Sequence, residues 1–453
     1  MKKIWVFISF AMLLLLISCG KANPNNDNND KNSDLSSDLN NDLVGDLKDN
    51  EDDKKDTDEE KRSVILEKLS SFSSDFTASA YQHNGKKDNF VVSPLSVFMA
   101  LSMIEATTQD SSSNQILNTI DLTHSEMVQL SKTLLSTMNK EYYSDELIEN
   151  DGHITRQKAG LLNITNSLWS NSAVELKRTA VLNLIDSLDT DVFKVDFEDS
   201  NKTSQRIVEY VKDKTEGIID LKEVILDKDS AFILLNTLYL KDGWGVSDLQ
   251  FTESVYDFMN NDGQITKTNL LTGGYFLGRV QQTEKYKHFY TKTQNGYKLK
   301  FIVPNNQYSI EDVFTKETIA EVNSISNYHS VDEGLKTKYY TRCLFPKFKV
   351  RFDDDIASTL QLLGIKDVFD KDKANFTALI DEKFHFSNIR HVVDLKVNEQ
   401  GIIGAAVTLG TSFGAPNDPY KKAYEDFVVD RSFGFIVTDS NDVQIFSGVI
   451  KNI

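Results

Sequence analysis

Cysteine and proline are scarce in this sequence. Its 453 residues include two cysteines and six prolines. Cys19 belongs to an apolar N-terminal segment, which leaves Cys343 alone in the remainder, so disulfide bonds cannot hold the fold together. Cys343 stands in a strand-like stretch shortly before a proline and has no recognisable catalytic partner. We interpret it as a buried strand thiol rather than a reactive nucleophile.

Basic residues are also fewer than acidic residues. Lys and Arg number 50 against 68 Asp and Glu, which gives a formal net charge of −18. No run of about five or more basic residues interrupts this balance. Phosphate and sulfate polymers would be repelled, so we expect no nucleic-acid partner. The hydrophobic content of 40%, with 27 Phe and 16 Tyr, is nevertheless ample for a large core.

Motifs of metal, redox and phosphate chemistry are missing. The sequence contains no His-Glu-x-x-His, no Cys-x-x-Cys and no Gly-x-x-x-x-Gly-Lys-Ser/Thr. The seven histidines are scattered, and the closest pair, His385 and His391, lies in a strand-like segment. We therefore expect no metal and no cofactor, and we do not expect an enzyme.

The N-terminus has the features of an export signal. Two lysines precede an apolar run that is shorter than the roughly 20 residues of a membrane span. The run ends in Leu-Ile-Ser-Cys, which resembles a bacterial lipobox. We predict a lipoprotein signal peptide over residues 1–19, with Cys19 as the lipid-modified residue that anchors an exported protein to the bacterial cell envelope or surface. An ordinary signal peptide with an incidental cysteine is the alternative.

Composition divides the rest of the chain into two parts. Residues 20–61 are rich in Asn, Asp, Ser, Glu and Lys, and cannot bury enough apolar surface to offset the entropy of ordering. We predict a disordered acidic tether there, with a weak helix through its regularly spaced leucines as the alternative. Residues 62–453 are globular in texture and show no second linker or repeat.

Helical and strand patterns alternate within residues 62–453. Apolar residues at helical spacing predict a helix over residues 62–82. Ser93 is a good N-cap and Pro94 suits the first turn of a second helix. The nearly continuous apolar run at 231–241 predicts a strand buried inside a sheet. Alternation through Phe348, Val350 and Phe352 predicts another strand, and the class is α+β with large sheets.

One stretch does not fit a packed core. Residues 398–416, NEQGIIGAAVTLGTSFGAP, are uncharged from Gly401 onward and rich in Gly, Ala, Ser and Thr, which fill a core poorly. Three interpretations of the stretch are open. It is a weak core strand, a membrane-active segment, or a strand held outside the fold for later use.

Several segments decide among these interpretations through their order and spacing. They are NFVVSPLSVFMALSM, LLNTLYLKDGW, FPKFKV, LGIKDVF, ANFTALI, IRHVVDLKVNEQGIIGAA and DRSFGFIVTDSNDVQIFSGVI. Together they resemble the serpin family over the whole globular body. The resemblance implies one domain of three β-sheets and eight or nine helices, with an exposed reactive-centre loop at about residues 399–424.

The resemblance also implies a mechanism. A target endopeptidase, of the serine class or alternatively of the cysteine class, cleaves the loop and becomes acyl-linked to it. The loop then enters the main β-sheet and traps the acyl-enzyme. A non-inhibitory serpin, acting as a protease substrate or as a binding protein, is the alternative. The protein is expected to be a monomer with a risk of polymerisation through its exposed strand.

The loop hinge follows from the same resemblance. The implied hinge residues are Glu399, Gln400, Gly401, Ile402, Ile403, Gly404, Ala405 and Ala406. On insertion, alternation would direct one set of side chains inward, namely Ile402, Gly404, Ala406, Thr408, Gly410 and Ser412. None of these is charged. Ile402, Ile403 and Gly404 depart from the family pattern, which usually has Thr or Ser, Glu, and Ala there, and this leaves the insertion speed in question.

The resemblance assigns polar residues to the place where the sheet opens. These are Ser93, Ser96, Asn236 and His391, with Lys241 and Trp244 near the point of insertion. Without the resemblance, each would be taken as ordinary core packing.

The scissile bond is less well marked. The family's usual spacing from Glu399 leads to Ala415–Pro416, but proteases seldom cleave before proline. The bonds Phe413–Gly414 and Gly414–Ala415 are better substrates nearby. These residues predict targets of the subtilisin, elastase or chymotrypsin type.

Overall fold

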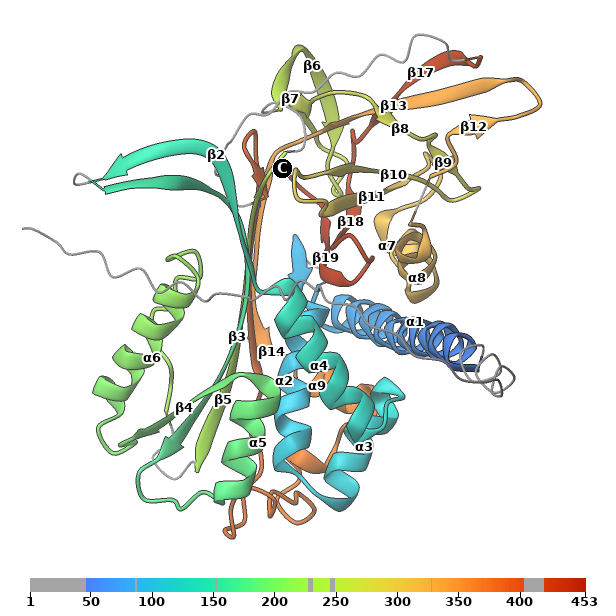
Figure 1. The fold of residues 1–453 in the computed structure, drawn as a ribbon. Coiled ribbons are helices and arrows are strands. Elements are labelled where there is room, and N and C mark those ends of the chain that lie inside the picture. The colour runs from blue at the N-terminus through green and yellow to red at the C-terminus, as the bar shows by residue number, and fades with distance from the viewer. Residues whose placement is uncertain are drawn as a thin grey trace, which may run out of the picture. The chain divides into compact units, whose positions relative to one another are not determined.

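The computed structural model describes residues 46–453, except 86–87, 151–152, 227–230, 245–248, 327 and 403–418. A compact unit runs from Glu60 to Ile453 (Figure 1). In the preceding unit, the only described part is the start of helix α1. The predicted lipobox, the first part of the tether, residues 403–418 of the loop and the scissile candidates lie outside the described residues, and the predicted end of the loop overlaps strand β17, which begins at Lys421.

The described residues form nine α-helices, in agreement with the expected eight or nine. They are α1 (Asp46–Ala80), α2 (Pro94–Thr107), α3 (Asp110–Ile120), α4 (His124–Met138), α5 (Arg178–Leu188), α6 (Ser200–Lys214), α7 (Ile310–Val313), α8 (Lys316–Ser324) and α9 (Ala357–Leu362). Ser93 caps α2 by accepting a hydrogen bond from the Ser96 amide, and Pro94 opens the helix as predicted. None of these helices is long and apolar enough to cross a membrane.

Helix α1 overlaps the end of the predicted tether. It begins at Asp46, inside the segment that we expected to be a disordered tether. Residues 46–61 contain neither glycine nor proline, the two residues that most strongly disfavour helix. They continue upstream the helix that apolar spacing predicts from residue 62.

The main sheet has the order β14–β15–β16–β5–β3–β2, with β4 paired to β3. Its strands are β2 (Lys140–Asn150), β3 (His153–Asn171), β4 (Thr190–Val195), β5 (Phe232–Gly243), β14 (Phe348–Asp355), β15 (Arg390–Val397) and β16 (Gly401–Ile402). The apolar run predicted as a buried strand is β5. In β14, Phe348, Val350 and Phe352 are buried in alternation, as predicted.

Two further sheets complete the expected three. The β19 sheet contains β1 (Phe90–Val92), β19 (Gln444–Ile450), β18 (Phe433–Thr438), β11 (Lys298–Pro304), β10 (Tyr286–Lys292) and β9 (Gln281–Gln282). The β13 sheet contains β12 (Val331–Asp332), β13 (Thr337–Phe345), β7 (Ile265–Thr272), β6 (Gln250–Met259), β17 (Lys421–Val428) and β8 (Phe276–Leu277).

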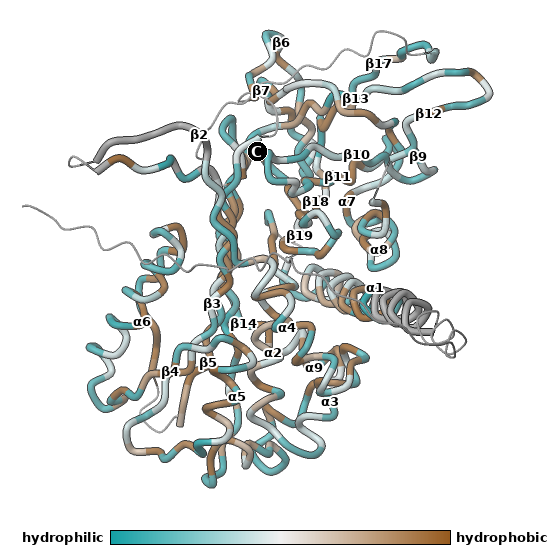
Figure 2. Tube along the Cα trace, in the orientation of Figure 1, coloured by the Kyte–Doolittle hydropathy of each residue, from teal (hydrophilic) through white to brown (hydrophobic). Residues whose placement is uncertain are grey.

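The main sheet separates two hydrophobic clusters. Helices α2 and α4 lie on one side of its long strands, and α6 lies on the other (Figure 1). The larger cluster joins α2 to the sheets, and hydrophobic residues gather there in Figure 2. The smaller cluster lies under α6 and consists of Trp169, Val195, Phe197, Ile207, Val211, Ile219 and Leu221. Helix α6 thus packs on a hydrophobic cluster that is separate from the large one.

Candidate functional site

The two-residue strand β16 is inserted between β15 and β5. Ile402 pairs with Val397 of β15 and with Asp242 of β5, and Gly401 pairs with Gly243. All of these pairs are antiparallel, and the Ile402 side chain is 0% exposed. In the described residues, β16 is the element that lies between β15 and β5 in the strand order. The start of the predicted loop is therefore already a strand of the main sheet.

A tight turn delivers Gly401 to this position. The Asn398 side-chain oxygen accepts hydrogen bonds from the amides of Gln400 (3.0 Å) and Gly401 (3.2 Å). Gly401 has φ of 155°, and a Cβ there would lie 2.1 Å from the Asp242 carbonyl oxygen. Only glycine permits so close an approach of two backbones.

Asp242 lies directly beside the hinge and was not among the predicted site residues. Its carboxylate accepts hydrogen bonds from the Asn295 amide (3.2 Å) and from Asn295 Nδ2 (2.6 Å). Burial raises the pKa of Asp242 to about 6, although these hydrogen bonds act in the opposite direction. The feature of the sequence that could have identified Asp242 is a charged residue next to a glycine at the end of an apolar strand.

Trp244 and Lys241 lie on either side of this point. Trp244 is buried, and its indole N–H donates to the Asn398 carbonyl at 2.9 Å, which supports the turn. Lys241 Nζ lies 3.4 Å from a Glu216 carboxylate oxygen, just beyond the end of α6. Glu399, at the start of the hinge, lies 3.6 Å from Lys347 across a partly exposed ion pair.

A polar network crosses the sheet below the hinge. The Ser93 amide donates to His391 Nε2 at 3.1 Å, and the Ser93 hydroxyl donates to the Ile445 carbonyl at 2.8 Å. The Ser96 hydroxyl donates to the Asn236 side-chain oxygen. Asn236 Nδ2 donates in turn to Asn166 Oδ1 at 2.8 Å. The four predicted opening residues thus share one region, and Asn166 joins them.

The hydrogen bond from Ser93 defines the tautomer of His391. Since Nε2 accepts, the neutral ring carries its proton on Nδ1. No hydrogen bond joins Nδ1 to another described residue. Burial lowers the pKa of His391 to about 4, so the ring is neutral near pH 7.

The segment that follows α6, residues 215–226, lies over the boundary between strands β5 and β15. We call this segment the cover and this boundary the seam. Arg351 of β14 donates to the Asp220 carbonyl at 3.4 Å, and Arg390 of β15 donates to the Glu223 carbonyl at 3.2 Å. Ile233 of β5 and Val392 of β15 both pack against the small cluster under α6. The cover therefore contacts both sides of the seam.

Other predictions concern chemistry outside this region. Cys343 is a buried free thiol whose Sγ lies 3.1 Å from the Tyr290 carbonyl, and burial raises its pKa well above the usual value. The interpretation as a buried strand thiol is confirmed. No group of three or more His, Cys, Asp or Glu residues suited to a metal ion occurs in the described part of the chain.

Comparison with known proteins agrees with this architecture. The family model for serpins (serine protease inhibitors) matches residues 67–453. Iripin-1 of Ixodes ricinus is 27% identical over 306 residues, covering 64% of this chain and 73% of iripin-1. The native crystal structure of tengpin, a thermophilic serpin, has a TM-score of 0.68 at 21% identity, covering 86% of this chain and 94% of tengpin.

A thyroxine complex of thyroxine-binding globulin is also similar in fold. Its TM-score is 0.67 at 19% identity, covering 86% of this chain and 99% of that chain. This chain belongs to the serpin family, whose members are generally protease inhibitors rather than catalysts. The expected serpin fold is confirmed.

We predict that Gly401→Ala displaces β16 from the sheet. The added Cβ would meet the Asp242 carbonyl oxygen at 2.1 Å, and overpacking of this kind costs about 1–3 kcal/mol. Hydrogen exchange of the Ile402 amide should become faster. Gly334→Ala is the matched control, because its Cβ would have 3.4 Å to the nearest atom. Equal exchange in both variants would contradict the close approach.

We predict that His391 makes stability fall in mild acid. Its pKa of about 4 lies below the ordinary 6.5, so between these values the unfolded chain binds a proton that the folded chain does not. The stabilisation is present above pH 6.5 and decreases by about 3 kcal/mol as the pH falls to 4. Denaturant unfolding of the wild type and of His391→Gln at several pH values measures this difference. Parallel pH profiles would contradict it.

Proposed function

We propose that this chain is a suicide-substrate inhibitor of serine endopeptidases. The observation that carries the proposal is β16, because the first residues of the loop already pair with both neighbours between which the rest would insert. Cleavage of the loop frees the new end to continue this pairing. The attached acyl-enzyme is then carried along the sheet.

Continuing the observed register assigns a position to each loop residue. Ile402 pairs with Asp242 and Val397, so each later loop residue faces one residue earlier in β5 and in β15. Thr408, six positions on, would lie between Asn236 and His391. Its hydroxyl would then reach the polar network and could accept from His391 Nδ1.

The other inward positions face apolar neighbours. Ala406 would lie between Leu238 and Val393, and Gly404 would lie between Leu240 and Leu395. All four of these neighbours are buried. The small, uncharged inward set predicted from the sequence suits this surface.

The outward positions face polar neighbours. Ile403 would lie between Lys241 and Lys396, and Ala405 between Tyr239 and Asp394. At this outward position the isoleucine lacks the carboxylate with which the family's usual Glu could pair with Lys241 or Lys396, but it places no charge in the interior. The departures at Ile402 and Ile403 are therefore compatible with insertion.

The energy of insertion is sufficient for trapping. A strand of about 12 residues, at roughly 1 kcal/mol net for each hydrogen bond, supplies on the order of 10 kcal/mol before apolar burial is added. Loss of a single oxyanion-hole donor slows a protease by about 10²–10³. Distortion of the enzyme's active site can thus stop deacylation.

We further propose where the protein acts and what it inhibits. The bonds between Phe413 and Pro416 remain the candidates for cleavage, with enzymes of the subtilisin, elastase or chymotrypsin type as targets. The lipobox-like segment supports export and attachment to a bacterial envelope through Cys19. The membrane is then reached only through this lipid.

A gel assay of the full chain with subtilisin, elastase and chymotrypsin tests the inhibitory function. We expect an SDS-stable band near the summed mass of the two proteins. Mass spectrometry of the released C-terminal peptide identifies the scissile bond from its first residue. Cleavage without any adduct would instead indicate a non-inhibitory serpin.

Two neighbouring alanines provide a sharper form of this assay. Ala406→Arg places a charge between Leu238 and Val393, and should convert the inhibitor into a substrate. Ala405→Arg places the same charge on the outward side near Asp394, and should retain most of the adduct. Equal yields for the two variants would overturn the register.

We predict that Cys19→Ser releases the protein from the membrane. The lipid anchor needs the Cys19 thiol, whereas Cys343 is buried in the fold. After expression in a bacterial host, partition between detergent and aqueous phases measures anchoring. Cys343→Ser should stay in the detergent phase with the wild type, and a detergent-phase Cys19→Ser protein would refute the anchor.

A further inference from the structure

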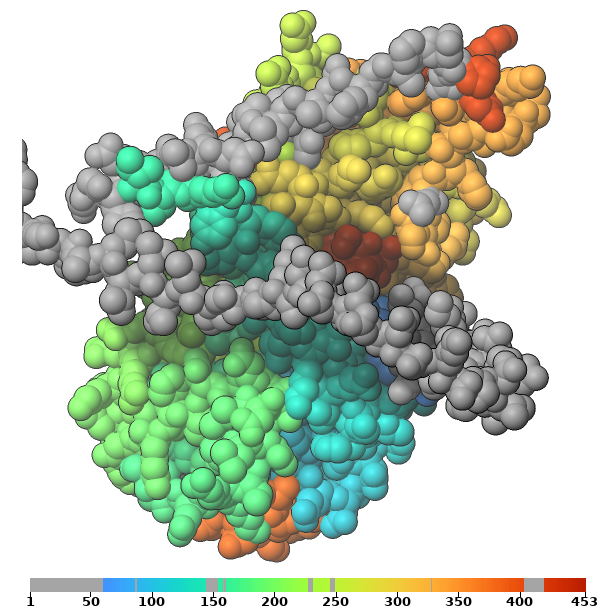
Figure 3. All heavy atoms as spheres, in the orientation of Figure 1, coloured from blue at the N-terminus to red at the C-terminus, as the bar shows by residue number. Residues whose placement is uncertain are grey.

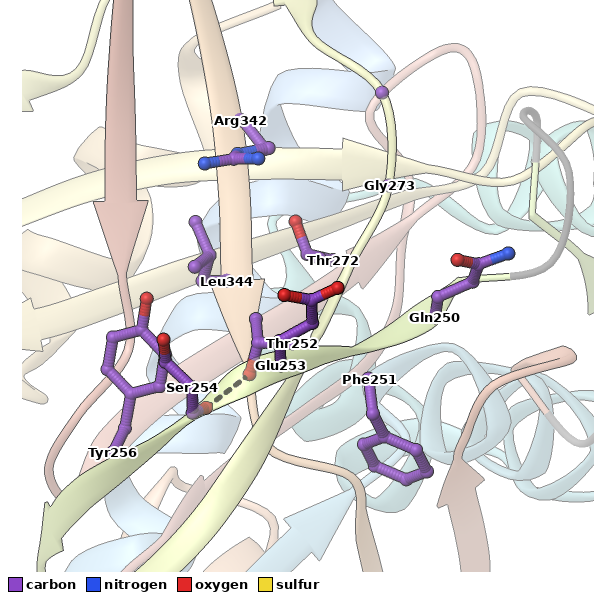
Figure 4. A pocket seen from close by; sticks show the side chains of 11 residues that line it. Gln250, Phe251, Thr252, Glu253, Ser254, Tyr256, Thr272, Gly273, Arg342 and Leu344 are labelled. Carbon is purple, nitrogen blue, oxygen red and sulfur yellow. Dashed lines mark hydrogen bonds between the residues drawn. The ribbon is translucent and has the colours of Figure 1, made fainter.

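Strands β6, β7 and β13 leave an opening at the surface of the β13 sheet. Strand β7 pairs with β13 only at its end, where Thr272 faces Leu344. The chain then leaves the sheet at Gly273 and rejoins it as β8. Atoms of β6 and β7, in yellow-green, lie at the surface in Figure 3. A surface pocket of about 520 Å³ lies at the opening (Figure 4).

A bulge in β6 forms one wall of the pocket. The pairing of β6 with β7 shifts its register between Phe251 and Val255. The Thr252 hydroxyl donates to the Ser254 carbonyl at 2.8 Å and accepts from the Leu270 amide at 3.1 Å. The chain itself therefore fixes the shape of the bulge, and bulges commonly redirect side chains. The residues between positions 251 and 255 line the pocket in a preformed arrangement.

The lining of the pocket is polar. Among the described residues that form it, only Phe251 and Leu344 have purely hydrocarbon side chains. Sites for drug-sized ligands are instead lined mainly by hydrophobic and aromatic groups. The pocket therefore suits a ligand that is itself rich in polar groups. Its volume lies within the roughly 300–1,000 Å³ of small-molecule sites, so a single ion would leave most of it empty.

Several of these polar groups have no partner in the described part of the chain. The Thr272 hydroxyl is buried and makes no hydrogen bond there. A buried hydroxyl is costly to leave unpaired, so it points to a ligand that supplies the missing bond. In Figure 4 the oxygen atoms of Tyr256, Glu253 and Thr272 lie on the same side of β6. The side chains that likewise make no hydrogen bond to another described residue are those of Gln250, Glu253, Ser254 and Tyr256.

The charge of the pocket excludes an anion. Arg342 donates from Nε and Nη2 to the two carboxylate oxygens of Asp426, at 2.9 and 2.8 Å. The positive charge of Arg342 is thereby neutralised. No ion pair joins Glu253 to another described residue, so its carboxylate is the uncompensated charge of the lining. A sulfated or phosphorylated ligand would be repelled by that carboxylate.

The unpaired groups include donors as well as acceptors. The hydroxyl groups of Ser254, Tyr256 and Thr272 can each donate and accept, and the Gln250 amide does both. A cation would use only the acceptors and would leave the donors unsatisfied. Each hydroxyl group of a sugar also donates and accepts, so a sugar can satisfy both kinds of group. The composition therefore favours a neutral, hydroxyl-rich ligand over an ion of either sign.

The Tyr256 ring supplies a surface for the apolar side of a sugar. Aromatic faces carry partial negative charge, and the C–H bonds on one face of a pyranose ring complement it. No aromatic ring or cation stacks on Tyr256 in the described residues. Phe251, in contrast, has Lys347 Nζ at 5.1 Å from its ring centroid. Tyr256 is thus the ring of the lining that is available to a ligand.

We propose that this pocket binds a neutral sugar unit of a glycan. Glu253 and Thr272 hydrogen-bond to its hydroxyl groups, and Tyr256 packs against its ring. The pocket belongs to the β13 sheet, whereas the seam between β5 and β15 belongs to the main sheet. This binding activity therefore does not rest on the inhibitory function. For a chain attached to a cell envelope, it would hold the protein against a surface polysaccharide.

Binding of short saccharides to the full chain tests the proposal. The ligands are glucose, N-acetylglucosamine, cellotetraose and chitotetraose, with a heparin tetrasaccharide as the charged control. Isothermal titration calorimetry gives the dissociation constants, and no protease is needed. We expect a neutral tetrasaccharide to bind more tightly than its monosaccharide, and the heparin tetrasaccharide not to bind. Binding of the monosaccharides alone would overturn the assignment to a glycan, and binding of no neutral saccharide would overturn the site.

Two substitutions separate a ligand contact from a structural role. Glu253→Gln should weaken tetrasaccharide binding by about tenfold and Thr272→Val by about fivefold. Thr272→Val should leave the thermal midpoint unchanged or raise it, because it deletes a buried hydroxyl that has no partner in the described fold. A fall in both affinity and thermal midpoint for Thr272→Val would contradict the ligand contact.

Glu175 provides the matched control. It is an exposed glutamate before α5, without a described ion pair, so Glu175→Gln changes the net charge as Glu253→Gln does. Glu175→Gln should bind the tetrasaccharide as the wild type does. Equal affinities for the wild type and both pocket variants would overturn the proposal, as would an equal loss in Glu175→Gln.

Discussion

The rest of the structure depends on the backbone hydrogen-bonding groups of two strands, β5 and β15. Backbone groups inside a sheet need partners, and in the described residues a third strand, Gly401–Ile402, pairs with both of them. A strand that entered the seam beyond Ile402 would gain the most backbone hydrogen bonds. The turn at Asn398, the close contact with Asp242 and the polar network around His391 all lie along it.

The division of the hydrophobic residues makes a change in this seam compatible with a stable fold. The large cluster lies on the α2 side, whereas α6 and the segment after it rest on a small cluster of their own. Besides this apolar packing, Arg351 and Arg390 hold that segment through its backbone carbonyls. The contacts of the cover are therefore largely separate from those of the principal core.

Sequence patterns predicted what depends on local chemistry or on strand alternation. The Ser93 cap, the buried strand β5 and the alternation in β14 followed from such rules. Asp242, Asn398 and Asn166 were not predicted, because their roles depend on which strands become neighbours and in what register. The surface pocket between β6 and β13 was not predicted either, since it requires a bulge in β6 and a gap beside β13 to face each other.

The parallel pairing of β17 with β13 affects how long the protein with an uncut loop stays active. An uncut loop could continue inward from β16 only if its far end supplied slack, and that end is fastened by pairs from Thr337–Lys421 to Leu344–Val428 and by the Arg342–Asp426 fork. Under the proposed mechanism, the working lifetime of the molecule is the time that this edge strand takes to peel away. Warmth should shorten that lifetime steeply, as it does for other barriers that require many bonds to break together.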